Sequence, residues 1–235
     1  MSADRLQAAL HCPSTFTHPN HEPVPLVHGT GADAATNWGW NYLRALPAAG
    51  FDACGVDLPD HALGDIQTSA GYAVYAIRFM HDATGHKVDV VGHSQGSLEP
   101  RWAIKWWPDV RADVDDLVGL SSPNHGVPVA NALCVVACDA ADCQFSVGSA
   151  FLRSLNAGDE TPSAVDQTSV MSVNDGVVEP ASTSELNGAA NVWVQSLCPL
   201  RVVDHLRMAH DAVVYTIVLD ALTHAGPLSS RASAR

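Results

Sequence analysis

The chain has 235 residues, of which 47% are hydrophobic and 16% are charged, and its formal net charge at pH 7 is −13. This length allows a full hydrophobic core, and the simplest organisation is a single domain over residues 1–235. So acidic a chain repels phosphate backbones and anionic lipid headgroups, which excludes nucleic acid and acidic membranes as expected partners. The longest apolar run, residues 212–219, is too short to cross a bilayer, so we expect no transmembrane segment.

Strand and helix patterns alternate along the chain. Residues 1–22 are polar and rich in turn residues, and we expect them to lie extended over the surface. Strands are predicted at 24–27, 51–58, 88–91, 114–121, 165–173 and 191–197, and helices at 38–46, 72–80, 98–107, 148–156 and 205–224. This alternation predicts an α/β fold with a mostly parallel central sheet and helices on both faces.

Residues 92–96, which we term the serine turn, read Gly-His-Ser-Gln-Gly and join a buried strand to a helix. So abrupt a reversal holds its middle residue in a strained conformation, and the flanking glycines let the backbones approach. Ser94 is therefore predicted to be a nucleophile at the carboxyl edge of the sheet. The N–H of Gln95, at the helix start, would face the developing negative charge.

A serine nucleophile needs a base, and the base needs an acid that fixes its tautomer. In this arrangement the acid comes between the serine and the histidine in the sequence. Asp175 follows a predicted strand and is our candidate for the acid, although Asp-Gly is also a common turn pair.

For the base we favour His205, which follows the last predicted strand at the start of the last predicted helix. His210 is the main competitor, but it is expected inside that helix. Asp204 adjoins His205, and consecutive side chains diverge, so it is a poor partner for the ring. His125 and His224 are more distant alternatives.

A second donor to the oxyanion should come from the loop after an early strand. Residues 28–31, His-Gly-Thr-Gly, lie in such a loop, and Thr30 offers both an N–H and a hydroxyl. Alone this tetrapeptide is a glycine turn; together with the serine turn it predicts an oxyanion hole formed by Thr30 and Gln95.

Six cysteines form an even set, which favours disulfides and an oxidising, extracellular location. A zinc site is less favoured, because the spacings among Cys134, Cys138 and Cys143 are not completed by a second tight Cys or His pair. The residues after Met1 lack the apolar segment of a signal peptide, so a secreted protein would be present here in its mature form.

Two further segments invite a functional interpretation. The acidic residues 109–116 lack the glycine and the terminal glutamate of a calcium loop, so we expect a solvated connection and no metal. Residues 127–145 mix apolar and acidic residues without a clean period. They are expected to form either a small lid over the substrate cleft or a plain structural loop.

Several of these motifs occur in the same order in one family. His28-Gly-Thr-Gly, the serine turn, Ser122-Pro-Asn-His-Gly, Asp159-Glu-Thr-Pro, the Asp175 loop and Val203-Asp-His resemble those of secreted actinobacterial lipases related to Candida antarctica lipase B. The resemblance runs from about Cys12 to His224. It implies an α/β-hydrolase fold, the triad Ser94, Asp175 and His205, and oxyanion donors at Thr30 and Gln95.

The same resemblance implies a disulfide between Cys12 and Cys54, and it leaves the pairing of Cys134, Cys138, Cys143 and Cys198 open. His93 replaces a tryptophan of the yeast enzyme, so that enzyme's alcohol pocket is not carried over. The candidates for the substrate pocket are His93, Asn124 and Phe145.

The function that we expect is hydrolysis of carboxylic esters through an acyl-enzyme, without a cofactor, on a lipid or other hydrophobic ester. A lipase acting on acylglycerols leads. A general esterase or polyester hydrolase with the same triad is the nearest alternative, and a non-catalytic lipid-binding relative is the most remote.

Overall fold

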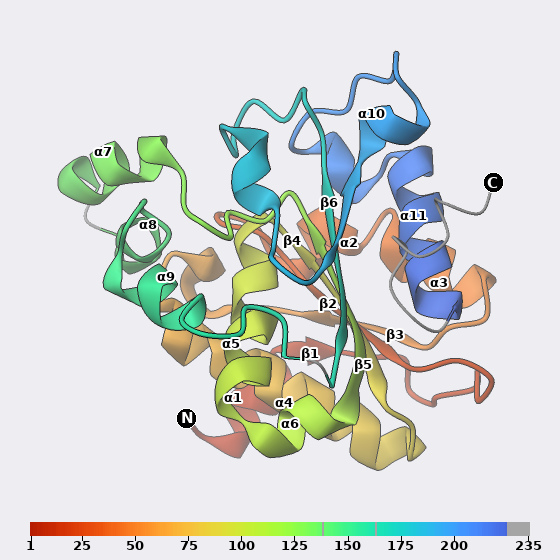
Figure 1. The fold of residues 1–235 in the computed structure, drawn as a ribbon. Coiled ribbons are helices and arrows are strands. Elements are labelled where there is room, and N and C mark those ends of the chain that lie inside the picture. The colour runs from red at the N-terminus through yellow and green to blue at the C-terminus, as the bar shows by residue number, and fades with distance from the viewer. Residues whose placement is uncertain (138, 163, 225–235) are drawn as a thin grey trace.

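The computed structural model describes residues 1–137, 139–162 and 164–224. At the centre of these residues is a seven-stranded sheet with the strand order β1-β3-β2-β4-β5-β6-β7 (Figure 1). Neighbouring strands are parallel except β1 and β3, which are antiparallel. The strands are β1 (Leu10–His11), β2 (Val24–Val27), β3 (Ala53–Val56), β4 (Val88–His93), β5 (Val114–Leu120), β6 (Asp166–Met171) and β7 (Ala190–Trp193).

The register of the central strands brings their carboxyl ends to one edge of the sheet. Val27 of β2 pairs with Gly92 of β4, Gly92 pairs with Gly119 of β5, and Gly119 pairs with Ser169 of β6. The loops that leave these four strands therefore start close together. They carry the residues that the sequence singled out, which makes this edge the place to look for a site.

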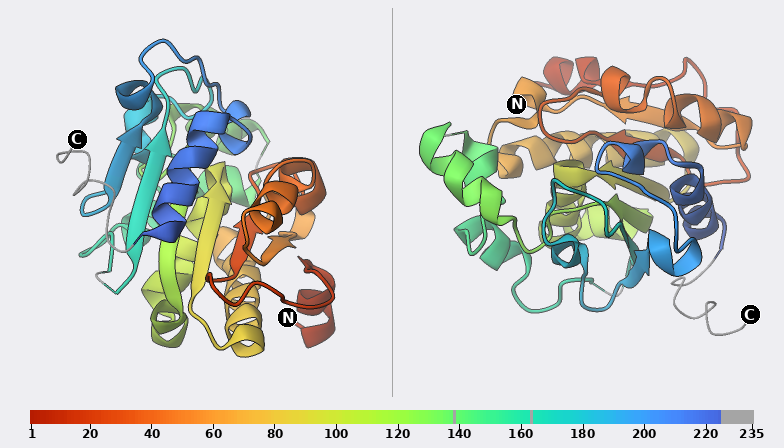
Figure 2. Two further views of the ribbon diagram at one scale, coloured as in Figure 1. Left: turned by 90° about the vertical axis from the view of Figure 1, so that its right-hand side faces the viewer. Right: turned by 90° about the horizontal axis from the view of Figure 1, so that it is seen from above.

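Helices cover both faces of the sheet (Figures 1 and 2). One face packs against α2 (Ala34–Trp38), α3 (Tyr42–Ala48) and α11 (Ala212–Thr223). The other packs against α4 (Ile66–Thr84), α5 (Leu98–Trp106) and α6 (Pro108–Asp113). The shorter helices are α1 (Ala3–Ala8), η1 (Pro59–Ala62), η2 (Ser94–Ser97), α7 (Pro128–Val136), α8 (Ala140–Gln144), α9 (Ala150–Leu155), η3 (Ala181–Ser184), α10 (Val194–Leu197) and η4 (Arg207–Ala209).

The alternation of side chains along each strand explains why the strands are apolar throughout. Leu26 points into the core beneath α3 and α11, whereas the next residue, Val27, points into the core beneath α4 and α5. In β4, Val91 likewise points into the first of these cores and Val90 into the second. A parallel sheet buried on both faces therefore needs apolar residues at successive positions, which is the run that the sequence shows.

Helix boundaries follow local polar residues. The Asp65 side chain accepts the Thr68 N–H at the start of α4, and Gly85 ends that helix in a left-handed conformation with a φ of 72°. The Asp211 side chain accepts the N–H groups of Val213 and Val214 and so begins α11. These caps supply partners for backbone groups that a helix end leaves unpaired.

Four expectations about individual elements were wrong. The predicted strand over 191–197 ends at Trp193, because residues 194–197 form α10. Residues 1–22 are not wholly extended, because α1 forms there and β1 adds an edge strand beside β3. The predicted helix over 38–46 is two helices, α2 and α3, separated at 39–41 where Asn41 caps the second one. The last helix starts at Ala212 rather than at His205, because Asp211 supplies its cap.

Residues 127–145, for which the sequence showed no clean period, contain α7 and α8. The two helices project from the body of the molecule (Figure 2), and a disulfide between Cys134 and Cys143 joins them. Within α7, Ala130 is the buried residue, and the neighbouring Val129, Leu133 and Val136 are exposed. The prediction about Cys138 lies outside the described residues.

A second disulfide joins Cys12 to Cys54, the pairing that the resemblance implied. It ties the segment after β1 to the buried strand β3. Cys198 has no disulfide partner among the described cysteines. None of the helices in the described ranges is both long enough and apolar enough to span a bilayer.

Candidate active site

The serine turn connects β4 directly to η2, which continues into α5. Ser94 has a φ of 55°, a left-handed conformation that costs a non-glycine residue about 1–2 kcal/mol. A Cβ on Gly92 would lie 2.5 Å from the Gly96 carbonyl oxygen, and a Cβ on Gly96 would collide with the carbonyl oxygen of His28. Only glycine fits at both positions. The close packing of the backbone at Gly92 and Gly96 holds Ser94 in this strained conformation.

The loop after β2 lies against this turn. A Cβ on Gly29 would come within 3.1 Å of the Ser94 Cβ, so the two backbones approach as closely as glycine allows. The Thr30 hydroxyl donates a 2.5 Å hydrogen bond to the Gln95 side-chain oxygen. The two residues predicted to hold the oxyanion are therefore joined directly, although 65 positions separate them in the sequence.

Asp175 and His205 meet above the same edge of the sheet. His205 Nδ1 lies 3.0 Å from both carboxylate oxygens of Asp175, and the His205 N–H donates to the Asp175 carbonyl at 2.9 Å. The carboxylate also accepts the N–H groups of Val177 and Val178 at 3.0 and 2.6 Å. Both residues are buried, with 3% and 7% of their surfaces exposed.

The protonation state of this pair follows from its contacts. Burial alone would raise the pKa of Asp175, but the hydrogen bond and charge of His205, together with the Val178 N–H, outweigh it and lower the pKa below its usual value. The carboxylate is therefore ionised at neutral pH. It fixes the His205 proton on Nδ1 and leaves Nε2 free to accept a proton.

His93 connects the serine turn to the loop between α10 and η4, which carries His205 and which we term the histidine loop. Its Nε2–H donates to the His205 carbonyl at 2.9 Å, and the two imidazole rings lie 4.9 Å apart between centroids. Burial, followed by the nearby His205, lowers the pKa of His93 to about 3, so its ring is neutral. Since His93 immediately precedes Ser94, this hydrogen bond holds the His205 loop beside the nucleophile.

The other histidines considered for the base, and the carboxylate of Asp204, have other hydrogen-bond partners. His210 precedes α11, donates from Nδ1 to the Leu206 carbonyl at 3.1 Å, and packs on Trp40. The Asp204 carboxylate accepts the Arg207 N–H at 2.9 Å. His125 and His224 pair with carboxylates near the surface.

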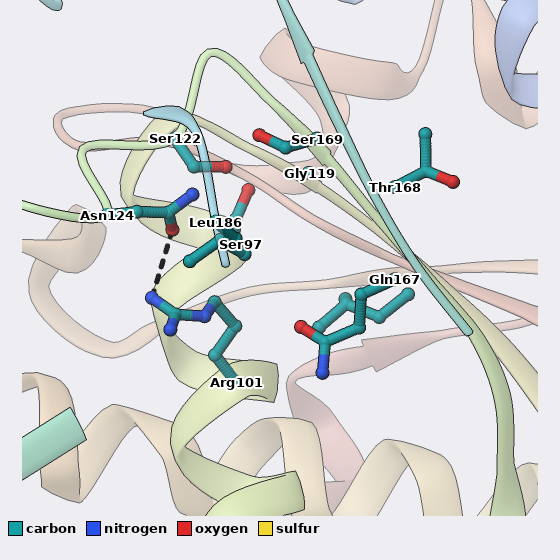
Figure 3. Close-up of a pocket in the computed structure, with 10 residues that line it drawn as sticks. Ser97, Arg101, Gly119, Ser122, Asn124, Gln167, Thr168, Ser169 and Leu186 are labelled. Carbon is teal, nitrogen blue, oxygen red and sulfur yellow. Dashed lines mark hydrogen bonds between the residues drawn. The ribbon is translucent and has the colours of Figure 1, made fainter. Parts of the chain in front are cut away.

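The three candidates for the substrate pocket are all buried side chains with protein partners. His93 has the contacts described above. Asn124 accepts a hydrogen bond from Arg101 at 3.1 Å, shown in Figure 3, and donates to the Ser184 carbonyl. Phe145 lies in the apolar cluster beneath α7 and α9. Their role in binding substrate stays a prediction.

Asn124 and Arg101 line a small cavity of about 10 Å³ (Figure 3). A space of that size holds at most about one water molecule. The hydroxyl groups of Ser97 and Ser122 also line it, and neither has a hydrogen-bond partner. A space this small cannot hold an acyl chain.

Three carboxylates from two strands could in principle hold a cation. Asp89, Asp115 and Asp116, which we term the acidic cluster, each place an oxygen within 4.8 Å of the others. The expectation of a solvated connection over 109–116 was wrong: residues 109–113 belong to α6, and Asp116, which is 9% exposed, lies in β5. Burial is the main cause that raises the pKa of Asp116 to about 8 and that of Asp89 well above its usual value.

The acidic cluster lies at the beginning of β4 and β5, whereas Ser94 follows the end of β4. A cation bound there would be at the opposite edge of the sheet from the serine turn. We therefore assign it no part in chemistry at Ser94.

A parallel sheet that carries a serine turn, an acid and a histidine in that order along the chain, on loops at its carboxyl edge, defines an α/β-hydrolase. A family model described as "Lipase (class 2)" matches residues 73–218, more than half of the chain. The chain belongs to this family.

Individual relatives agree with this assignment. Lipase B of Pseudozyma antarctica is 30% identical over 227 residues, which cover 92% of this chain. The crystal structure of Aspergillus fumigatus lipase B is 27% identical, with a TM-score of 0.85 over 97% of this chain. The chain spans 66% of the length of the first and 59% of the second. A Bacillus licheniformis lipase structure in its mature form shares the fold, with a TM-score of 0.72 at 18% identity over 92% of this chain and 98% of its own.

Sequence reasoning missed one contact and one side chain near the site. It did not find the hydrogen bond from His93 to the His205 loop, for which no local pattern exists. It also missed Glu99, which is buried and accepts a hydrogen bond from Gln95. A signal was available here, because residues four apart on a helix lie on one face.

Proposed function

We propose that this protein is a serine hydrolase that cleaves carboxylic esters, with acylglycerols as its main substrates. The observation that carries the proposal is the buried pair of His205 and Asp175, held by hydrogen bonds at 3.0 Å beside the strained Ser94. Membership of the lipase family supports acylglycerols as the substrate class.

In this proposal, Ser94 Oγ attacks the ester carbonyl while His205 Nε2 takes its proton. The Asp175 carboxylate stabilises the imidazolium that forms. His205 then returns the proton to the departing alcohol, which leaves an acyl group on Ser94. Water, activated by the same histidine, releases the carboxylic acid.

The oxyanion is assigned to the N–H groups of Thr30 and Gln95. Gln95 is the second residue of η2, where backbone N–H groups have no acceptor within the helix. The Thr30 hydroxyl donates to the Gln95 side chain in this structure. This hydrogen bond joins the two residues, so that both N–H groups can point toward the oxyanion.

Other substrates and a non-catalytic role remain as alternatives. A general esterase or polyester hydrolase would use the same residues with a different pocket. A protein that only binds lipid has no use for a nucleophile, a base, an acid and an oxyanion hole assembled at one edge of a sheet, so we disfavour it.

We also propose that the protein acts outside the cell. Two disulfides, Cys12–Cys54 and Cys134–Cys143, support an oxidising location. Residues 127–145 are proposed as a small lid whose motion the second disulfide limits. The whole of residues 1–235 is proposed to form one domain.

Labelling with a fluorophosphonate, combined with a short-chain ester assay, tests the proposal. We expect Ser94→Ala to abolish labelling, and Ser94→Ala and His205→Ala each to lower kcat by about 10³-fold or more without unfolding the protein. Asp175→Asn should cost somewhat less. The matched controls Asp204→Asn and His210→Ala should change kcat little. Loss of activity in His210→Ala but not in His205→Ala would show that the wrong base was chosen.

A further inference from the structure

Glu99 is a buried carboxyl group that the mechanism above does not use. It lies in the first turn of α5, three residues after the end of the serine turn, and none of its surface is exposed. Its Oε1 accepts a hydrogen bond from Gln95 Nε2 at 3.0 Å, and its Oε2 has no hydrogen-bond partner. Burying a carboxyl group without a cationic partner is costly, so its presence at this position calls for a reason.

The Gln95 side chain links Glu99 to the oxyanion hole. Gln95 Nε2 donates to the Ala62 carbonyl at 2.8 Å as well as to Glu99, and Gln95 Oε1 accepts the Thr30 hydroxyl. A backbone carbonyl can only accept, so Ala62 fixes which end of the amide faces Thr30. Glu99 takes the second N–H of the same amide group. Together these contacts hold the Gln95 side chain in one orientation.

We propose that Glu99 is a positioning residue for the oxyanion hole: by accepting the Gln95 side-chain N–H, it holds Gln95 against Thr30 and so keeps the two oxyanion donors in register. This inference rests on the proposed function. Glu99 touches neither substrate nor reacting atoms in this role and acts only through Gln95.

The protonation state of Glu99 suits this role. Burial raises the pKa of Glu99 to about 8, against a smaller opposite effect of the Gln95 hydrogen bond. The carboxyl group is therefore neutral at pH 7, with its proton on Oε2, because Oε1 accepts from Gln95. A neutral acceptor supports the amide without placing a negative charge behind the site where the oxyanion forms.

The test compares two variants on a soluble ester such as p-nitrophenyl butyrate. Glu99→Gln is neutral and keeps an acceptor for Gln95, whereas Glu99→Leu fills similar space without one. We expect Glu99→Leu to lower kcat by about 10-fold with little change in KM, since the lost stabilisation belongs to the transition state. Glu99→Gln should stay within about 3-fold of the wild type. Glu99→Met replaces the leucine variant if that variant does not fold.

Two controls separate positioning from general destabilisation. Ile104→Val loosens the buried face of the same helix, and it should lower Tm without lowering kcat. In a double-mutant cycle with Thr30→Val, the combined loss in kcat should be clearly smaller than the product of the two single losses, because both variants damage one linked unit.

Three results would overturn the role of Glu99: an unchanged kcat in the leucine or methionine variant, equal losses in Glu99→Leu and Glu99→Gln, or losses that multiply fully with Thr30→Val. These results are distinct from failure of the proposed function. In that case the wild-type protein itself would not hydrolyse the ester or react at Ser94.

Discussion

Replacing Asp116 by asparagine should reduce the pH dependence of the unfolding free energy. Asp116 lies in β5, and its backbone N–H donates to Asp89 Oδ1 at 3.2 Å, a contact that the substitution leaves intact. Burial, followed by the charges of Asp115 and Asp166, raises the pKa of Asp116 from 3.8 to about 8 in the folded protein.

The sign of the effect follows from proton binding. Between pH 4 and pH 8 the folded protein holds a proton on Asp116 that the unfolded chain has released, so stability falls as pH rises. Where the two states differ by one bound proton, the unfolding free energy changes by about 1.4 kcal/mol for each pH unit. Between pH 5 and pH 8 this amounts to about 4 kcal/mol. Asp89 lies in the same acidic cluster and shares in the proton affinity. We therefore expect a measured effect of about 2–4 kcal/mol.

The assay is urea unfolding followed by circular dichroism at pH 5, 7 and 9, with the disulfides intact and with EDTA present to keep divalent cations off the acidic cluster. Asp116→Asn should gain stability relative to the wild type as the pH rises. Asp109→Asn is a suitable control, because Asp109 is exposed and the hydrogen bond from Arg78 lowers its pKa. Its carboxylate is ionised in both the folded and the unfolded protein from pH 5 to pH 9, so the difference from the wild type should stay constant over this range.

Parallel stability curves for the wild type and Asp116→Asn would refute the reasoning. They would show that Asp116 is ionised in the folded protein at pH 5, and that burial does not govern its protonation.

Two further predictions concern the disulfides and the proposed lid. Replacing Cys12 and Cys54 by alanine should lower the unfolding free energy by about 4 kcal/mol in the chain-entropy model, since the bridge closes a separation of 42 residues; a loss below about 1 kcal/mol in denaturant unfolding would contradict it. Because Cys134–Cys143 limits the motion of α7 and α8, hydrolysis of tributyrin should rise smoothly across its solubility limit. A many-fold step there would indicate a mobile lid.

The sequence alone determined the features that depend on neighbouring residues. Apolar runs separated by glycines and helical periods were enough to predict a mostly parallel sheet with helices on both faces, because these patterns act over a few residues. The serine turn was equally local: Gly92 and Gly96 are needed wherever a strand reverses into a helix so tightly. Element boundaries were predicted less accurately. The apolar period placed the start of the last helix at His205, whereas the cap at Asp211 starts it at Ala212.

Only the tertiary structure decided which distant groups meet. His205 and Asp175 are 30 positions apart, and their contact depends on the path of the histidine loop. His93 holds that loop through a hydrogen bond to the His205 carbonyl. Asp89 and Asp116, 27 positions apart, enter one acidic cluster because β4 and β5 are adjacent and their register shifts between Val88 and Val90. The cysteine count likewise permits several pairings that only the packing of α7 against α8 resolves for Cys134 and Cys143. A chain encodes its local conformations within a few residues, whereas these contacts depend on strand order, register and loop closure, which the fold settles as a whole.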